Sequence, residues 1–217
     1  FIGSQLVEAL QQRNRSSNEK VTIFATDVKE VLPFKLDDYT KYFQIDVRSS
    51  DLKELVQREN IQSVVHLASI VTPGKKSNRE FEYSVDVEGT QNVLEACVAH
   101  NVRRIIVTSS GAAYGYYSDN PQWIKETDAI RGNEEFPYSY HKRLVEEMLA
   151  HYRKSYPQLE QVIFRIGTIL GKNVNNQITN LFEKRFLIGV RHSDSPFVFI
   201  WDEDIVQCLV KGIFDDE

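Results

Sequence analysis

Residues 104–111 read Arg104-Ile105-Ile106-Val107-Thr108-Ser109-Ser110-Gly111, and this stretch decides the fold. A short apolar run that ends in hydroxyl side chains and glycine predicts a buried parallel strand opening into a loop. Ligands in open α/β sheets bind beyond the carboxyl ends of the strands. The hydroxyl groups at the end of this strand are therefore candidates for a binding or catalytic site.

A second segment, Pro137-Tyr138-Ser139-Tyr140-His141-Lys142, places a tyrosine and a lysine four residues apart. In a helix the two side chains lie on one face, one turn apart, and the same face continues through Val145 and Leu149 toward a core. A free phenol has a pKa of about 10, and a neighbouring ammonium group lowers that value. We therefore predict that Tyr138 and Lys142 form an acid–base pair for chemistry on an alcohol or a ketone. Chance is the alternative explanation, because the chain contains ten tyrosines.

The two segments together resemble the extended short-chain dehydrogenase/reductases of the NAD-dependent epimerase/dehydratase family. Ser110, Tyr138 and Lys142 match the serine, tyrosine and lysine of that family, and Tyr114-Gly115 matches its Tyr-Gly pair. The resemblance covers nearly the whole chain. It implies that Tyr138 removes the proton from a substrate hydroxyl while Ser110 orients that oxygen. It also implies that Lys142 lowers the pKa of Tyr138 and holds the nicotinamide ribose.

Strands and helices are predicted to alternate along the chain, which indicates a Rossmann-like, doubly wound parallel sheet with helices on both faces. Among them are a strand over Ser63–Ser69 and a long helix from Tyr83 to His100, in which close packing is the expected reason for Gly89. The resemblance implies an NAD-binding domain over residues 1–165 and part of a smaller substrate-binding lobe over residues 166–217. Gly3 matches the third glycine of the family's phosphate loop. We therefore expect that the first strand, most of that loop and the C-terminal end of the family lie outside this sequence.

Asp27 follows the predicted strand 20–25, and an acidic residue at this place in a dinucleotide site hydrogen-bonds the adenosine ribose and repels a 2′-phosphate. This position favours NAD over NADP, although a solvated aspartate in a turn is the alternative. The resemblance implies further cofactor contacts along the strand ends and at the start of the first helix. The predicted cofactor-binding residues are Phe1, Ile2, Gly3, Asp27, Asp46, Val47, Leu67, Ala68, Ser69, Ser109, Tyr138, Lys142 and Ile166.

Four positions depart from the family's pattern. Asp86 stands where the family usually has asparagine, and His141 stands where it commonly has serine. Thr168 replaces an asparagine that often touches the sugar nucleotide, and Leu170 replaces a tyrosine. The last two departures weaken the assignment to a nucleotide sugar more than they weaken the assignment of the fold.

Composition narrows the classes of partner. A formal net charge of −5 argues against nucleic acid as the main partner, because a nucleic-acid site is basic. No apolar run in this sequence approaches the roughly 20 residues that a membrane-spanning helix needs, and we expect no secretory signal. Cys97 and Cys208 have neither metal-site nor disulfide spacing, so we predict core packing, no metal site and a cytoplasmic location. A homodimer is a possible assembly.

The leading hypothesis is an NAD-dependent epimerase or dehydratase that acts on a nucleotide sugar by hydride transfer. One alternative is an NAD(P)-dependent dehydrogenase or reductase of a non-sugar alcohol or ketone, which Thr168 and Leu170 favour. Another is a non-catalytic dinucleotide-binding sensor or scaffold. The complete set of Ser110, Tyr138 and Lys142 argues against this last alternative.

Overall fold

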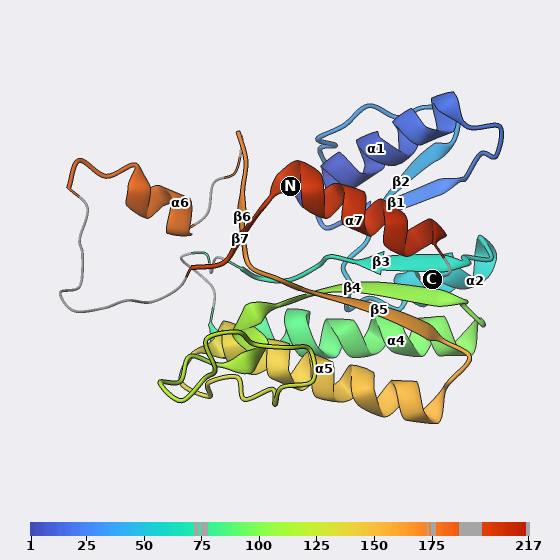
Figure 1. Ribbon diagram of the computed structural model, residues 1–217. Helices are drawn as coiled ribbons and strands as arrows, with labels where there is room; N and C mark the ends of the chain where they lie inside the picture. Colours follow the sequence, from blue (N-terminus) through green and yellow to red (C-terminus); the bar gives the residue numbers. More distant parts are fainter. Residues whose placement is uncertain (72–73, 75–77, 173, 175–176, 187–196, 216–217) are drawn as a thin grey trace.

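The computed structural model describes residues 1–71, 74, 78–172, 174, 177–186 and 197–215 (Figure 1). The elements, in chain order, are α1 (Ile2–Ser16), β1 (Ile23–Asp27), β2 (Thr40–Gln44), α2 (Asp51–Arg58), β3 (Ser63–His66), α3 (Arg79–Tyr83), the π-helical turn η1 (Ser84–Glu88), α4 (Gly89–Ala99), β4 (Arg104–Ser110), the 3-10 turn η2 (Gly111–Tyr114), α5 (Pro137–Ser155), β5 (Glu160–Ile166), β6 (Thr168–Leu170), α6 (Gln177–Phe182), β7 (Phe199–Trp201) and α7 (Asp202–Phe214).

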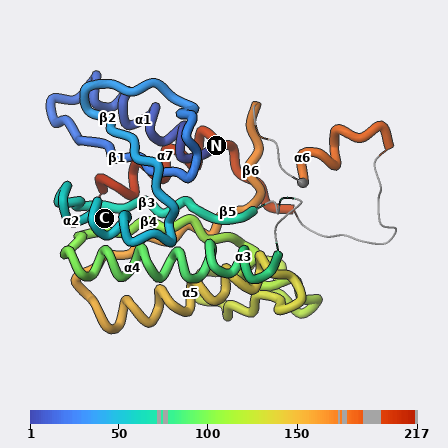
Figure 2. Tube along the Cα trace, turned by 180° about the vertical axis from the view of Figure 1, so that it is seen from behind, coloured from blue at the N-terminus to red at the C-terminus, as the bar shows by residue number. Residues whose placement is uncertain are grey.

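The strands pair in parallel throughout the described residues, as the sequence predicts. β3, β4 and β5 form one sheet, β1 pairs with β2, and β6 pairs with β7. Helices α1 and α7 cover one face of the three-stranded sheet, and α4 and α5 cover the other (Figures 1 and 2). The α/β fold with helices on both faces of a parallel sheet is confirmed.

The strand that decides the fold, β4, lies in the middle of the three-stranded sheet and is buried on both faces. Ile105 and Val107 pack into the core beneath α4 and α5, whereas Ile106 packs into the core beneath α1 and α7. This alternation follows from the two-residue period of a strand. A strand covered on both faces needs apolar residues at consecutive positions, which explains the run that begins at Ile105.

The segment 79–99 departs from the single helix that the sequence predicts from Tyr83 to His100. The helix begins earlier, at Arg79, and its middle is the π-helical turn η1. Gly89 follows this turn, and a Cβ added to it would lie 2.6 Å from Val47 Cγ1, so the predicted close packing of Gly89 is confirmed. A π-helical turn inserts extra backbone into a helix and is common at functional sites.

β3 is also shorter than predicted, because it ends at His66 rather than at Ser69. The chain then leaves the β3–β4 ladder, and the backbone N–H of Ile70 donates to Asp86 Oδ1 at 2.8 Å. The segment after β3 is therefore held by a side chain of η1 and not by a neighbouring strand.

Cys97 and Cys208 are free thiols that pack with the cores on opposite faces of the sheet, as predicted. Burial raises the pKa of Cys97 to about 12. In the described part of the chain, no helix is long and apolar enough to cross a bilayer. Within the same residues, no three His, Cys, Asp or Glu side chains gather as a metal ion would require.

Candidate functional site

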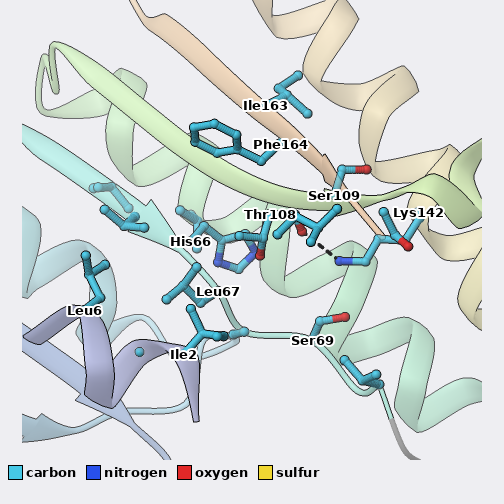
Figure 3. A pocket seen from close by; sticks show the side chains of 18 of the residues that line it. Ile2, Leu6, His66, Leu67, Ser69, Thr108, Ser109, Lys142, Ile163 and Phe164 are labelled. Atoms are coloured by element: carbon cyan, nitrogen blue, oxygen red, sulfur yellow. Dashed lines mark hydrogen bonds between the residues drawn. The ribbon is translucent and has the colours of Figure 1, made fainter. Parts of the chain in front are cut away.

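A large cavity of about 3220 Å³ runs along the three-stranded sheet beside β1, and its lining includes both the amino ends of the strands, at Ser63 and Arg103, and the carboxyl ends, at Ser109 and Ile166. Ser110, Tyr138 and Lys142 all line it. Every residue predicted to bind the cofactor also lines it, from Phe1 at the start of the chain to Ile166 at the end of β5. Because this lining also includes core residues on both faces of the sheet, the contacts of Ser110, Tyr138 and Lys142 show how these three side chains meet. The edge of the cavity toward β3 and β4 is drawn in Figure 3.

Ser110 is the last residue of β4 and also opens the turn that follows. Its Oγ accepts a hydrogen bond from the backbone N–H of Ala112 at 3.2 Å, which caps the 3-10 turn η2. The strand therefore stops at the cavity with its final hydroxyl held in place by the next two residues.

Helix α5 is fastened to this strand end by buried polar contacts. Ser139 is fully buried, and its hydroxyl donates to the carbonyl of Ala112 at 2.6 Å and accepts from the backbone N–H of Asn133 at 2.9 Å. Lys142 Nζ donates to the carbonyl of Thr108 at 3.0 Å, the contact drawn as a dashed line in Figure 3. These contacts place the N-terminal turns of α5 against the carboxyl end of β4.

Tyr138 lies between Ser110 and Lys142. Its side chain hydrogen-bonds the side chain of Ser110, and Lys142 Nζ is 5.6 Å from the centre of its ring. Burial raises the pKa of Tyr138, the hydrogen bond with Ser110 opposes this shift, and the negative charge of Asp86 adds to it. The net direction is opposite to the one expected from the Tyr/Lys pair. The ammonium group of Lys142 lies over the ring and donates to the carbonyl of Thr108, and burial of the phenol has the larger effect on its pKa.

Lys142 is itself buried, and burial lowers its pKa, while the nearby carboxylates of Asp86 and Glu146 oppose that shift. A buried ammonium is costly unless hydrogen bonds and opposite charges compensate it. The Thr108 carbonyl and these two carboxylates provide that compensation.

Glu146 is the centre of a buried network that the sequence analysis missed. Its carboxylate accepts hydrogen bonds from the Ser109 hydroxyl and from Arg165 Nε and Nη2. Arg165 Nη1 also donates to Tyr114 Oη at 2.6 Å. The available signal was a glutamate four residues after Lys142, on the side of α5 that also carries the buried Leu149. The network joins α5, β4, β5 and η2, and its members Ser109, Tyr114 and Arg165 also line the cavity.

Two acidic residues predicted to bind the adenosine half lie at the other end of the cavity. Asp27 is exposed at the end of β1, where its Oδ1 accepts the backbone N–H of Lys29 at 3.1 Å. Asp46 forms a bidentate pair with Arg48, with oxygen–nitrogen distances of 2.6 and 2.9 Å, and this pairing lowers the pKa of Asp46. Val47, beside it, packs on Gly89.

The remaining predicted cofactor residues lie near the ends of β3 and β4. A Cβ added to Gly3 would lie 3.6 Å from Leu67 Cδ1, so the first turn of α1 meets the segment that follows β3. Ser69 Oγ is buried and has no hydrogen-bond partner in the described structure. Ser109 is different, because its hydroxyl donates to Glu146 behind the strand. The predicted contact of Ser109 with the cofactor would therefore be made by its backbone atoms, since its hydroxyl is bonded to Glu146.

Comparison with known proteins shows which protein family this sequence matches. A model described as "NAD dependent epimerase/dehydratase family" matches residues 1–196. UDP-glucose 4-epimerase from Erwinia amylovora is 29% identical over 189 residues, which are 82% of this chain and 53% of that protein. A putative UDP-glucose 4-epimerase from Methanocaldococcus jannaschii is 24% identical over 92% of this chain and 63% of that protein. The chain thus spans about half to two thirds of the length of these relatives.

Solved structures agree in fold. MoeE5 in complex with UDP-glucuronic acid and NAD superposes with a TM-score of 0.78 at 23% identity, over 100% of this chain and 70% of that chain. UDP-glucose 4-epimerase from Thermus thermophilus in complex with NAD gives a TM-score of 0.73 at 22% identity, over 100% of this chain and 72% of that chain. The family match covers most of the sequence. The chain therefore belongs to the NAD-dependent epimerase/dehydratase family.

Proposed function

We propose that this protein is an NAD-dependent epimerase that acts on a nucleotide sugar and uses Ser110, Tyr138 and Lys142 for the proton chemistry. The observation that carries the proposal is the meeting of Ser110, Tyr138 and Lys142 at the carboxyl end of β4. These three side chains, which come from β4 and α5, line the cavity together with every position predicted to bind NAD. The relatives named as UDP-glucose 4-epimerases support a uridine diphosphate hexose as the substrate class.

The residues around the cavity fit a dinucleotide. The exposed carboxylate of Asp27 suits the hydroxyls of the adenosine ribose. The buried hydroxyl of Ser69, which has no hydrogen-bond partner among the described residues, suits a polar group of the nicotinamide half. Small residues at 68–69 leave room for close approach beside Lys142. When bound, NAD supplies the chemistry of hydride transfer, and the protein supplies position and electrostatics.

In this proposal, side chains of the protein carry out the proton transfer. Tyr138 takes a proton from a sugar hydroxyl at its phenolic oxygen and gives it back later. Ser110, already hydrogen-bonded to Tyr138, orients the sugar oxygen. Lys142 keeps the ammonium charge beside the Tyr138 ring, where it favours the phenolate when the cavity is filled. Burial of Tyr138 and Lys142 strengthens these interactions, because the effective dielectric constant is low there.

The segment from residue 166 onward is proposed to contribute to substrate binding, with β6 and β7 as its paired strands. Thr168 and Leu170 lie in β6, and Thr168 lines the cavity. These two departures from the family's pattern favour a second candidate function. That candidate is the net oxidation or reduction of a non-sugar alcohol or ketone with NAD(P).

One assay separates the two functions. The full-length protein is incubated with a catalytic amount of NAD and with UDP-glucose, and the sugars are followed by proton NMR. We expect UDP-galactose to accumulate without a matching increase in the absorbance of reduced nicotinamide, since an epimerase restores its cofactor in each cycle. Stoichiometric reduction of added NAD by a non-sugar alcohol would instead establish the second candidate. Tight NAD binding with no turnover of any kind would contradict both and favour a sensor.

Cofactor preference provides a further prediction. We expect the full-length protein to bind NAD at least about tenfold more tightly than NADP, a difference of about 1.4 kcal/mol. Asp27→Ala should narrow that ratio, because the 2′-phosphate then meets no carboxylate at the end of β1. Isothermal titration with both cofactors measures the ratio. Asp38→Ala, an exposed aspartate between β1 and β2, is the control and should leave the ratio unchanged. An unchanged ratio in Asp27→Ala would contradict the assignment.

A further inference from the structure

Two of the residues that depart from the family's pattern meet in the core. Asp86 comes from η1 and His141 from α5, 55 residues apart in the sequence. His141 Nδ1 lies 3.1 Å from Asp86 Oδ2, and the side chains are only 1% and 4% exposed. A buried carboxylate and a buried imidazole at this distance form one pair, because each is the other's polar neighbour in a core that excludes water.

The pair connects the segments that surround the cavity. Asp86 Oδ1 accepts the backbone N–H of Ile70, in the segment that follows β3. The backbone carbonyl of Asp86 accepts the hydroxyl of Thr90, which lies 2.9 Å from His66 Nε2 on β3. Asp86 is thus bonded to the end of one cavity-lining segment and, through His141, to the helix that carries Tyr138 and Lys142.

The local backbone explains how Asp86 reaches inward. It lies in the middle of the π-helical turn, which interrupts the regular helix between α3 and α4. A π-helical turn changes the direction of the side chains that it carries, so the carboxylate can face both Ile70 and α5. The ring of Tyr83, just before this turn, packs edge-on against His141 with ring centres 5.7 Å apart.

His141 is adjacent to the proposed catalytic residues on α5. It lies one helical turn after Tyr138 and directly before Lys142. Its Nε2 is buried without a hydrogen-bond partner in the described structure, so the contact with Asp86 is the polar interaction that holds the ring. This contact therefore joins the turn of α5 that carries Tyr138 and Lys142 to η1.

The charge of Asp86 also acts on both neighbours. It raises the pKa of Tyr138, against the hydrogen bond from Ser110, and it raises the pKa of Lys142, against burial. The other groups that act on Tyr138 are Ser110 at the end of β4 and Tyr116 in the loop after η2, with Lys142 beside the ring. Asp86 is therefore coupled to the site both through hydrogen bonds and through its charge.

We infer that Asp86 and His141 act together as a positioning pair, which fixes the face of α5 that bears Tyr138 and Lys142 against η1 and the segment after β3. The catalytic meaning of this pair rests on the proposed function, whereas its existence as a coupled unit does not.

The test is a double-mutant cycle in the full-length protein, with Asp86→Asn, His141→Ser and the two combined. His141→Ser alone leaves a buried carboxylate without its partner, and we expect a loss of kcat on the order of 10–100-fold from misplacement of α5. The double variant has neither the buried carboxylate nor its partner, so no unpaired charge remains, and we expect it to recover at least half of that loss on a logarithmic scale. His151→Ser makes the same substitution at an exposed position of α5 and should leave kcat unchanged.

A second readout does not depend on turnover. The phenolate of Tyr138 is followed by ultraviolet difference absorbance against Tyr138→Phe as the pH rises. In Asp86→Asn the phenolate should form at lower pH, because the charge that raises the pKa of Tyr138 is gone. A merely structural role would leave this titration in place.

The outcomes separate the pair from the proposed function. If the losses of kcat in the two single variants add up to the loss in the double variant, the residues are independent and the pair is overturned. The pair is also overturned if His141→Ser does not fold and the double variant does not restore folding. An unmoved Tyr138 titration in Asp86→Asn would overturn its link to the site. Wild-type protein that turns over no nucleotide sugar would refute the proposed function. In that case the pair is still tested by the titration of Tyr138 and by whether the changes in thermal unfolding temperature of the single variants add up in the double variant.

Discussion

Tyr138→Phe is expected to lower kcat by about 10²–10⁴-fold while NAD binding is retained. The substitution removes only the phenolic oxygen, which hydrogen-bonds Ser110 in the cavity, and it keeps the ring that packs beside Lys142. Because proton transfer then has no side chain to accept or return the proton, the chemical step slows and the cofactor contacts remain. Steady-state epimerisation and calorimetric titration with NAD, both in the full-length protein, measure the two quantities.

Tyr140→Phe is the matched control for this experiment. It removes the same atom two residues further along α5, where the ring packs against Arg79 and Arg143 on a different side of the helix. We expect its kcat to stay close to that of the wild type. A Tyr138→Phe variant that keeps kcat within about threefold of the Tyr140→Phe control would remove Tyr138 from the proposed mechanism.

The second large effect is expected from the Glu146 network. Glu146→Ala should lower the free energy of unfolding by about 3–5 kcal/mol, because it leaves the guanidinium of Arg165 and the hydroxyl of Ser109 without their buried partner. The side chain of Glu146 is 2% exposed and that of Arg165 is 20% exposed, so little water replaces the lost hydrogen bonds. Urea denaturation of the full-length protein, followed by circular dichroism, measures this change.

Glu147→Ala is the control, since it removes the same carboxylate from the next position on α5. That side chain is 59% exposed and lies 3.7 Å from Arg143, and such exposed pairs contribute about 0–1 kcal/mol. We therefore expect a small change in stability. Equal losses from the two variants would mean that the Glu146 network does not stabilise the fold as its burial indicates.

The sequence alone was sufficient to predict the strand and the helix that carry the candidate catalytic residues. The apolar run ending in Ser110 predicted β4, and the Tyr138/Lys142 spacing predicted α5. Both signals are local: one depends on a strand buried on two faces, and the other depends on the helical repeat. The family resemblance added the cofactor positions, and all of these positions line the same cavity.

Segment boundaries were harder to predict. The sequence pattern extended β3 through Ser69 and began the next helix at Tyr83, whereas β3 ends at His66 and the helix begins at Arg79. The two errors have different causes. After His66 the backbone N–H of Ile70 donates to Asp86, a contact 16 residues away that no local pattern marks. The helix begins early because Asn78 caps it by accepting the backbone N–H of Phe81.

The sequence by itself determined the parallel α/β fold, the strand and helix that carry the candidate catalytic residues, and the family. Only the tertiary structure decided which polar groups pair in the core. It showed that Asp86 and His141 are partners, and that Glu146 links Ser109 with Arg165. It also showed that burial raises the pKa of Tyr138. Propensity and periodicity act over a few neighbouring residues. These contacts join segments 19–55 residues apart, and they form only when packing excludes water from both partners.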